Sequence, residues 1–432
     1  MILQAAKSSL RGAVAIPGSK SHTVRAVVLA SLAGGDSRIR APLDSLDTRA
    51  AVEAYRAFGA LIDTSDPACW RVRGFTGRPH VPESVVDVAN SGTTLYIVMA
   101  TAALCAEGWT VITGDDQIRR RPADRLMFAL CDLGASVFST RDNGMCPLVV
   151  RGPLKGGSTQ IEAVTSQWVT AILLNAPLAD GDTDLEVTRL NEAPYVRITL
   201  DWLERLGVRI EHDAELTRFH IPGRQTIPAF DRSVPADFSS ATFFLVAGAA
   251  LDADIEITGL DVTDPQGDKA VVDHLCAMGA RIVVDEQTNS IRVSRSELKG
   301  ADLDLNATPD ALPAMAVAGA LARGTTRLLN VPQARVKETD RIAVMAAELA
   351  KMGVRVQELP DGLVVEGTEG GLKGSSDLSG HGDHRVVMAL SLAAMAAPTP
   401  CRIDTAEAVA VTFPTYVELM QGLGAKMKIT EK

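Results

Sequence analysis

The chain has 432 residues, of which 46% are hydrophobic, with a formal net charge of −10 and a mean hydropathy of +0.11. This length and apolar content suffice for two or three domains with large cores, and no apolar stretch is long enough to span a membrane. The negative charge argues against a nucleic-acid or membrane-surface binding protein. The six cysteines form no Cys-x-x-Cys pair and the seven histidines lack zinc-site spacing, so we expect reduced thiols, a cytoplasmic location and no metal.

Short β-rich pieces alternate with helical patterns along the whole chain. The expected strands include Ala13–Ile16, Thr110–Ile112, Ser158–Ile161, Asp254–Thr258 and Thr326–Leu329. The expected helices include Arg49–Phe58, Arg125–Leu133, Arg197–Leu206, Lys269–Met278, Asp340–Met352 and Pro414–Leu423. This alternation predicts an α/β protein.

One short pattern occurs six times: the end of a helix, a glycine, a small or β-branched residue, and a strand. Its glycines lie 71 to 75 residues apart and are Gly59, Gly134, Gly207, Gly279, Gly353 and Gly424. Glycine at this place is typical of a helix that ends in the left-handed conformation. The spacing predicts six similar α/β units.

A small polar cluster begins an apolar helix in each of the six units. The clusters are 18–21, 90–93, 165–167, 237–240, 308–310 and 382–385. Ser, Thr, Asn and Asp cap helices, so capping alone explains any single cluster. Six clusters at one period also fit a second interpretation. If two sets of three helices face each other, their N-termini converge on one cleft and attract anions.

Two longer motifs carry a family resemblance. Pro17–Arg25 reads PGSKSHTVR and Arg335–Arg341 reads RVKETDR. They resemble the PGSKSxxxR and RVKExDR signatures of the 5-enolpyruvylshikimate-3-phosphate (EPSP) synthase family of enolpyruvyl transferases. Shorter matches follow in the family's order over nearly the whole chain: Asn90–Thr94, Arg121–Pro122, Ser166–Gln167, Pro194–Tyr195, Pro309–Asp310, Asp383–Arg385 and Thr412–Pro414.

The resemblance implies a two-lobed inside-out α/β barrel with three β/α units per lobe around pseudo-threefold axes. The first lobe is expected at 18–235 and the second at 1–17 plus 236–432, with the active site in the cleft between them. The resemblance also implies a monomer that uses no metal and no organic cofactor.

The implied reaction joins phosphoenolpyruvate to the 5-hydroxyl of shikimate 3-phosphate by addition and elimination, and releases phosphate. The candidate catalytic residues are Lys20, Asp310 and Glu338. Asp310 would be the base near the hydroxyl, or a simple helix cap after Pro309. Glu338 would move the proton at C3, or form a solvated ion pair at a helix start. Lys20 would contact phosphoenolpyruvate, or lie on the surface.

The resemblance also implies two binding sets of charge-assisted donors. The phosphoenolpyruvate set is Lys20, Gly92, Thr93, Arg121, Gln167, Arg341 and Arg385. The shikimate 3-phosphate set is Lys20, Ser21, Arg25, Thr165, Ser166, Gln167, Tyr195, Asp310, Gln333 and Lys337. His384 belongs either to the edge of this site or to the hydrogen-bonded structure.

Four positions depart from the family pattern, and they are Tyr96, Glu192, Gln333 and Val411. Tyr96 and Val411 each replace a cation, whereas Glu192 replaces a serine that helps hold the acceptor's phosphate. Neighbouring Asn191 is a candidate to supply the lost hydrogen bond. We therefore expect weaker inhibition by glyphosate, the family's phosphoenolpyruvate-site inhibitor. A transferase for another hydroxylated acceptor, or a non-catalytic ligand-binding paralogue, are the alternatives.

Overall fold

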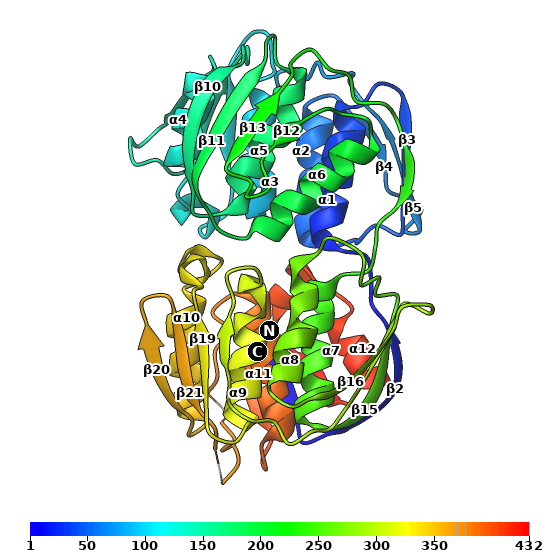
Figure 1. Ribbon diagram of the computed structural model, residues 1–432, viewed down its shortest axis with the longest axis vertical. Helices are drawn as coiled ribbons and strands as arrows, with labels where there is room; N and C mark the ends of the chain where they lie inside the picture. The colour runs from blue at the N-terminus through cyan, green and yellow to red at the C-terminus, as the bar shows by residue number, and fades with distance from the viewer. Residues whose placement is uncertain (369, 376, 432) are drawn as a thin grey trace. The chain divides into compact units, whose positions relative to one another are not determined.

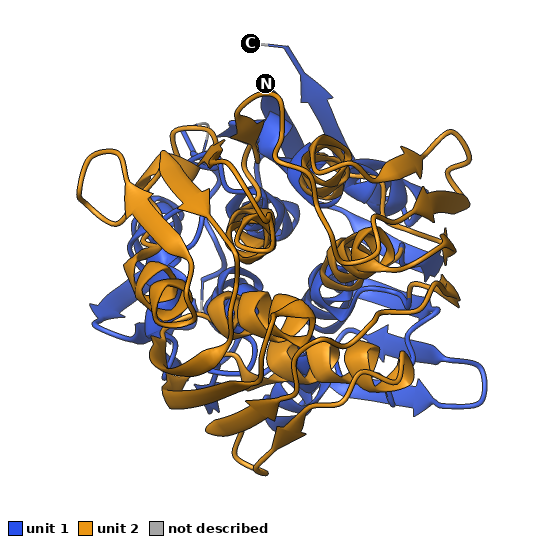
Figure 2. Ribbon diagram, turned by 90° about the horizontal axis from the view of Figure 1, so that it is seen from above, with its two compact units in different colours: residues 1–17, 235–432 blue, residues 18–234 orange. Residues whose placement is uncertain are grey.

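The structure is a computed structural model that describes residues 1–368, 370–375 and 377–431. The chain folds into two compact units (Figures 1 and 2). Unit 1 comprises Met1–Pro17 and Pro235–Lys432, and unit 2 comprises Gly18–Val234. The second crossing between the units therefore falls one residue before the expected boundary at 235/236.

Unit 2 contains three four-stranded sheets with one shared topology, in which the first two strands in space are parallel and the remaining neighbours are antiparallel. In spatial order the first sheet is β14 (Asp231–Ser233), β3 (Asp36–Arg40), β5 (Cys69–Arg73) and β4 (Leu61–Asp63). The second is β6 (Val86–Asp87), β7 (Thr110–Thr113), β9 (Leu148–Arg151) and β8 (Ser136–Ser139). The third is β10 (Gly157–Ala163), β11 (Thr183–Leu190), β13 (Arg218–Ile221) and β12 (Glu211–His212).

Unit 1 repeats this topology in two sheets and closes the third with the N-terminal strand. In spatial order the first is β2 (Ser9–Ala15), β15 (Asp252–Thr258), β17 (Ser290–Ser294) and β16 (Arg281–Asp285). The second is β18 (Asp302–Asp304), β19 (Thr325–Leu329), β21 (Gly362–Glu366) and β20 (Arg355–Leu359). In the third, β1 (Ile2–Ala6) lies between β22 (Cys401–Asp404) and β23 (Lys426–Thr430), antiparallel to both. The strand that begins the chain therefore completes the last repeat.

Each repeat has one buried helix and one amphipathic helix. The buried helices are α1 (Lys20–Leu32), α3 (Gly92–Ala102), α5 (Ser166–Asn175), α7 (Phe238–Ala250), α9 (Leu312–Leu321) and α11 (His384–Ala396). The amphipathic helices are α2 (Leu46–Ala57), α4 (Asp124–Asp132), α6 (Ala193–Arg205), α8 (Val271–Ala277), α10 (Arg341–Lys351) and α12 (Tyr416–Gly422). The buried helices carry apolar side chains on all sides, which is the pattern of a helix inside a core. Within each unit the sheets lie outside these helices (Figure 1).

Short 3-10 helices complete the connections. They are η1 (Ile118–Arg120), η2 (Ala176–Leu178), η3 (Gly267–Ala270), η4 (Pro309–Ala311), η5 (Pro332–Val336) and η6 (Ala406–Val411). One of them explains a difference from the expected helix bounds, since η3 includes Lys269, where the helix was expected to begin, and leaves a shorter α8.

The six repeated glycines confirm the predicted helix ends. All six have positive φ, between 73° and 106°. After each glycine, the next residue donates its N–H to a carbonyl five residues back, as Ala60 does to Tyr55 at 3.0 Å and Val354 does to Leu349 at 3.1 Å. These are Schellman motifs, which turn each helix directly toward the following strand. Only after Gly207 is the strand delayed, because β12 begins at Glu211.

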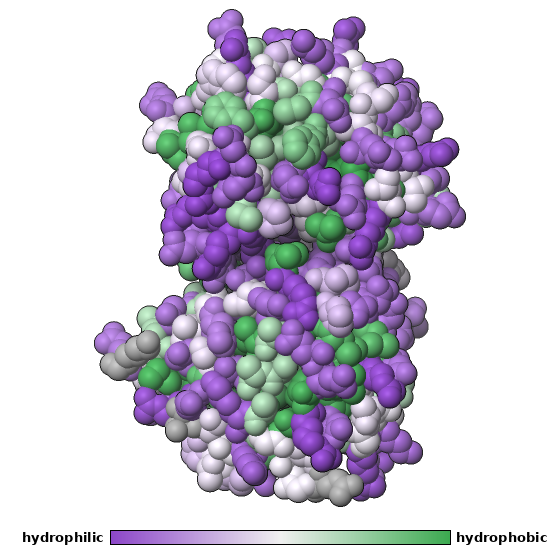
Figure 3. All heavy atoms as spheres, turned by 90° about the vertical axis from the view of Figure 1, so that its left-hand side faces the viewer, coloured by the Kyte–Doolittle hydropathy of each residue, from purple (hydrophilic) through white to green (hydrophobic). Residues whose placement is uncertain are grey.

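The visible face of each unit is mainly hydrophilic, with small scattered hydrophobic areas (Figure 3). Across the described part of the chain, no helix has both the length and the apolar character needed to cross a bilayer.

Candidate functional site

The buried helices begin at the predicted polar clusters, and capping explains four of the six. Ser91, Thr165, Asp237 and Asp383 accept hydrogen bonds from backbone N–H groups of the helices that follow them. Ser19 makes no such bond at α1, and η4 comes between Thr308 and α9. The first and fifth clusters therefore carry their polar side chains for another purpose.

In unit 1, one buried guanidinium gathers carboxylates from three helix starts. Arg341 is 1% exposed. Its Nη1 donates to Asp310 Oδ1 and its Nη2 to Glu338 Oε2, both at 2.7 Å. Its Nε donates to Asp383 Oδ2 at 2.7 Å, and Nη2 also reaches Asp383 Oδ1 at 3.2 Å. Arg385 Nη2 lies 2.9 Å from Asp310 Oδ2. The structure thus brings three predicted residues, Asp310, Glu338 and Arg385, together with the predicted Arg341.

The charges of this cluster hold Arg341 in its ionised form. Burial alone would lower the pKa of Arg341, but Asp383, Glu338 and Asp310 together raise it above the ordinary value. The five side chains carry two positive and three negative charges, so an incoming anion can exchange with a carboxylate without leaving a guanidinium bare.

Two alternative interpretations from the sequence, a simple helix cap for Asp310 and a solvated ion pair for Glu338, are wrong. Asp310 lies inside η4 and binds two arginines, so it is not a simple cap. The side chain of Glu338 is 12% exposed and pairs with a buried partner, so this is not a solvated pair. Carboxylates held beside guanidinium groups are suitable for moving protons on an anionic substrate.

Three further residues of unit 1 lie near this cluster in sequence. Gln333 is buried and its Nε2 donates to Asn306 O at 3.0 Å. This hydrogen bond holds η5 in place and does not join Gln333 to another predicted site residue. Lys337 follows η5 directly and is half-buried. His384 is 2% exposed, and burial lowers its pKa to about 4, so the ring is neutral near pH 7.

In unit 2, Lys20 is held rather than free on the surface. Lys20 is the first residue of α1, its side chain is 16% exposed, and its Nζ lies 3.0 Å from Asp47 Oδ2. Asp47 is buried in the first turn of α2. The ammonium group is therefore positioned by a buried carboxylate, and the surface interpretation is wrong.

The starts of α3 and α5 also lie together. Gln167 Nε2 donates to Thr93 Oγ1 at 3.0 Å. Arg121 is 5% exposed and lies against Gly92, where an added Cβ would come 2.1 Å from Arg121 Nη1. Glycine is needed here because the arginine covers it.

Arg25 joins three helices of unit 2. Its guanidinium donates to Thr199 Oγ1 at 2.9 Å, Ser21 O at 2.9 Å, Thr170 Oγ1 at 3.3 Å and Tyr195 O at 2.9 Å. Burial lowers its pKa to about 10, so it stays charged at neutral pH. The backbone carbonyls of Ser21 and Tyr195 thus accept from one cation, and the role of Arg25 toward an acceptor stays a prediction.

Glu192 lies beside the start of α5. It is 1% exposed, and its Oε2 accepts from Ser166 Oγ at 2.8 Å, Ser166 N at 3.2 Å and Thr165 Oγ1 at 3.2 Å. The amide of Asn191 is directed elsewhere, since its Nδ2 donates to Val164 O at 3.2 Å. Glu192 is therefore the group that meets these hydroxyls, and a hydrogen bond from Asn191 to the acceptor's phosphate stays a prediction.

The two positions that lost a cation carry uncharged side chains. Tyr96 is buried, packs edge-on against Trp168 and donates to Pro122 O at 2.9 Å. Burial raises the pKa of Tyr96 to about 12, so it is uncharged. Val411 is the last residue of η6 and is half-buried.

Sequence reasoning gave no role to two carboxylates that organise the site. Asp383 stood in a quoted motif, and its helix-capping position signalled only a structural function. Asp47 had no signal, because the expected helix began only at Arg49, whereas the observed α2 includes Asp47 in its first turn. Both act by contact with a predicted cation, Arg341 and Lys20, which only the folded chain reveals.

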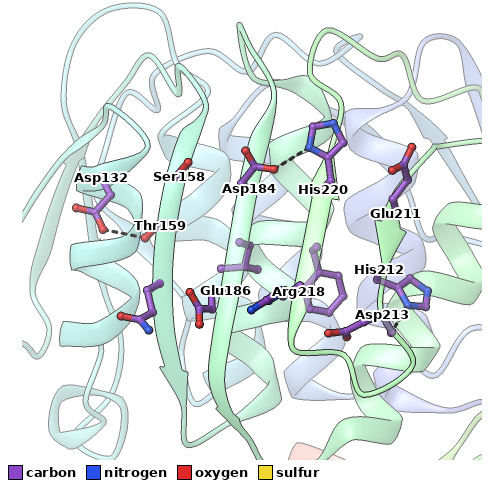
Figure 4. A pocket seen from close by; sticks show the side chains of 13 residues that line it. Asp132, Ser158, Thr159, Asp184, Glu186, Glu211, His212, Asp213, Arg218 and His220 are labelled. Carbon is purple, nitrogen blue, oxygen red and sulfur yellow. Dashed lines mark hydrogen bonds and ion pairs between the residues drawn. The ribbon is translucent and has the colours of Figure 1, made fainter.

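A broad hollow on unit 2 lies elsewhere, on the outer face of the sheet that contains β10, β11, β13 and β12 (Figure 4). It is open and about 960 Å³ in volume. The described side chains that line it include none of the predicted site residues. Its acids already have neighbours, for example Asp184 with His220 at 2.8 Å and Asp132 with Thr159 at 2.8 Å. It is a solvated sheet face.

Comparison with known proteins gives one consistent family. The family model described as EPSP synthase (3-phosphoshikimate 1-carboxyvinyltransferase) matches residues 4–420. Proteins named 3-phosphoshikimate 1-carboxyvinyltransferase are similar over their whole length. The one from Acetivibrio thermocellus is 52% identical over 100% of both chains. The one from Ruminiclostridium cellulolyticum is 49% identical over 99% of this chain and 100% of its own.

Solved structures have the same fold. An EPSP synthase from Acinetobacter baumannii aligns with a TM-score of 0.83 and 26% identity over 100% of both chains. The enolpyruvyl transferase NikO from Streptomyces tendae aligns with a TM-score of 0.80 over 99% of this chain and 98% of its own. Its identity of 21% shows a common fold and nothing more.

Proposed function

Because the chain belongs to the EPSP synthase (3-phosphoshikimate 1-carboxyvinyltransferase) family, we propose that it transfers the enolpyruvyl group of phosphoenolpyruvate to the 5-hydroxyl of shikimate 3-phosphate. The hydroxyl oxygen bonds to C2 while C3 gains a proton. The resulting tetrahedral intermediate then loses phosphate and a proton from C3. Atoms balance without a metal, a redox partner or an organic cofactor.

The residues of unit 1 supply proton transfer and anion binding in this proposal. Asp310 accepts the proton of the attacking hydroxyl, and Glu338 serves the proton at C3. Arg341 and Arg385 bind the negative groups of phosphoenolpyruvate, together with Lys20, Arg121 and Gln167 of unit 2. The carboxylates that now pair with the arginines can yield to a bound anion, since guanidinium groups bind carboxylate and phosphate alike.

The starts of α1, α5 and α6 hold the acceptor. Ser21, Arg25, Ser166 and Tyr195 are assigned to shikimate 3-phosphate, with Thr165, Gln167, Gln333 and Lys337. Helix N-termini favour a phosphate through their free N–H groups and dipole. We further propose that the enzyme works as a cytoplasmic monomer, as its family resemblance implies.

The cluster around Arg341 is the observation that supports this proposal most. Burying the Arg341 guanidinium to 1% exposure carries a desolvation cost, which its contacts with Asp310, Glu338 and Asp383 offset. Buried clusters of charged groups are typical of functional sites. A second arginine, Arg385, shares the Asp310 carboxylate. Paired cations with proton-accepting groups between them match the needs of an enol phosphate reaction.

The test is phosphate release from phosphoenolpyruvate, measured with and without shikimate 3-phosphate. We expect release only with the acceptor. Lys20→Ala should lower the rate at least about a hundredfold, as loss of one stabilising charge typically does. Lys7→Ala removes an exposed lysine directly after β1 and should leave the rate unchanged.

No acceptor-dependent release from folded protein would contradict the proposal. One observation, the carboxylate of Glu192 beside Ser166, favours a second candidate, an enolpyruvyl transferase with an unphosphorylated hydroxylated acceptor. Turnover of another acceptor with no turnover of shikimate 3-phosphate would select it.

A further inference from the structure

A carboxylate of the protein fills an anion position at the start of α5. One oxygen, Glu192 Oε2, receives an O–H and an N–H from Ser166, at 2.8 and 3.2 Å, and an O–H from Thr165 at 3.2 Å. These donors stand at the N-terminus of a ten-residue helix. Two hydroxyls and a helix-start N–H directed at one oxygen are the arrangement that binds a phosphate oxygen.

The fold holds this carboxylate in place. Glu192 has φ 60° and ψ 39°, a left-handed conformation that is unfavourable in a residue other than glycine. The preceding residue, Asn191, is bound twice to the end of β10, by its N–H to Ala163 O and its amide to Val164 O, each at 3.2 Å. The backbone at Glu192 therefore directs the carboxylate at Ser166, and the side chain is not a mobile surface group.

Glu192 and a phosphate cannot share these donors. Two like charges in close contact repel strongly at the effective dielectric of a partly buried site. The donors are also too few, because Glu192 Oε2 already takes the N–H and both hydroxyls. A phosphate that approaches Ser166 must therefore displace the side chain of Glu192.

We infer that Glu192 is a specificity-determining residue, an internal anion that a phosphate-bearing acceptor must displace from Ser166 and Thr165. The inference rests on the proposed function, which assigns the acceptor's phosphate to this helix start. Displacing Glu192 costs the same for every phosphate, but inorganic phosphate has no ring with which to gain other contacts that offset this cost. The device therefore keeps the released product out of the acceptor position.

The experiment measures dissociation constants by calorimetry without phosphoenolpyruvate, for shikimate 3-phosphate and for shikimate. Glu192→Ser should tighten binding of shikimate 3-phosphate at least about tenfold, which corresponds to about 1.4 kcal/mol. It should leave shikimate unchanged, because shikimate carries no phosphate. Glu192→Gln removes only the charge and should give a smaller gain. Glu186→Ser, on the exposed face of β11, is the matched control and should behave as the wild type.

Unchanged or weaker binding of shikimate 3-phosphate in folded Glu192→Ser and Glu192→Gln would overturn the inference, and so would an equal gain for shikimate. Thermal unfolding shows that each variant is folded, and the near-isosteric Gln variant keeps the test if Ser does not fold.

Inorganic phosphate separates this inference from the proposed function. It should bind Glu192→Ser more tightly than the wild type, and adding Ser166→Ala should remove the gain. That result holds or fails whether or not the wild type turns over shikimate 3-phosphate. Phosphate release by the wild type tests the function alone.

Discussion

Arg341 and Asp383 form an ion pair that is closed off from solvent. Nε lies 2.7 Å from Oδ2, and the two side chains are 1% and 0% exposed. The other oxygen of Asp383 accepts the N–H of Arg385 at 2.9 Å and caps α11. One carboxylate thus joins the start of α10 to the start of α11. Its charge offsets that of a buried cation, so this contact matters for stability as well as for the site.

Replacing Asp383 with Asn should destabilise unit 1 strongly. The substitution removes one of the three carboxylates bound to Arg341, and losing hydrogen bonds to a buried charged group typically costs about 1.5–3 kcal/mol. We expect the free energy of unfolding, measured by urea denaturation, to fall by an amount in that range.

The exposed pair Asp254–Arg292 gives the control. Its atoms are 2.8 Å apart, but the side chains are 41% and 65% exposed. Asp254→Asn should not measurably change stability, because water screens such a pair. Equal effects of the two substitutions would show that burial does not set the strength of the Asp383 contact.

His384 should make the protein less stable in mild acid. Burial lowers its pKa from 6.5 to about 4 in the folded protein. Between these values the unfolded chain binds the proton and the folded one does not, so stability falls as the pH decreases from 6.5 to 4. The full effect of this one group is about 3 kcal/mol by linkage.

The measurement is the difference in unfolding free energy between wild type and His384→Gln from pH 7 to pH 4. Other groups titrate alike in both proteins, so the difference isolates His384. A difference that stays constant over this range would contradict the neutral buried ring.

Gly92→Ala should impair the binding of phosphoenolpyruvate more than the fold. The new Cβ would lie 2.1 Å from Nη1 of Arg121, so the end of that side chain must move. We expect KM for phosphoenolpyruvate to rise at least about tenfold, since a displaced charge-assisted contact is worth about 1.5–3 kcal/mol. Gly422→Ala is the control, because nothing lies within 4 Å of its added Cβ. A similar KM in both variants would contradict the role of Arg121.

The sequence predicted the repeats well because each depends on local chemistry. A glycine after a helix, such as Gly353, needs only its own turn to adopt positive φ, and all six did so. The buried helices were equally predictable from the sequence, because a helix with apolar side chains on every face is stable only inside a core. What the sequence could not show is that β1 completes the last sheet between β22 and β23, a pairing between the two ends of the chain.

The candidate site was predicted in its cations and less well in their partners. Lys20 and Arg341 stand in recognisable motifs, whereas the carboxylates Asp47 and Asp383 become their partners only through tertiary contact. Glu192 was recognised as a departure, but its direction toward Ser166 follows from a left-handed backbone that no periodicity predicts.

Val411 is the departure that bears most directly on inhibition. The resembling family has a lysine here that reaches phosphoenolpyruvate, and this chain has a half-buried valine at the end of η6. Glyphosate competes for the same anion-binding position in that family, so the missing cation should weaken the binding of both ligands.

Val411→Lys should restore one charge-assisted contact, which is worth about 1.5–3 kcal/mol when it forms well. We expect the inhibition constant of glyphosate to fall about tenfold or more, together with KM for phosphoenolpyruvate. Steady-state assays at saturating shikimate 3-phosphate measure both, with Val336→Lys on an exposed valine as the control. Inhibition that Val411→Lys leaves unchanged would show that the valine does not set glyphosate sensitivity.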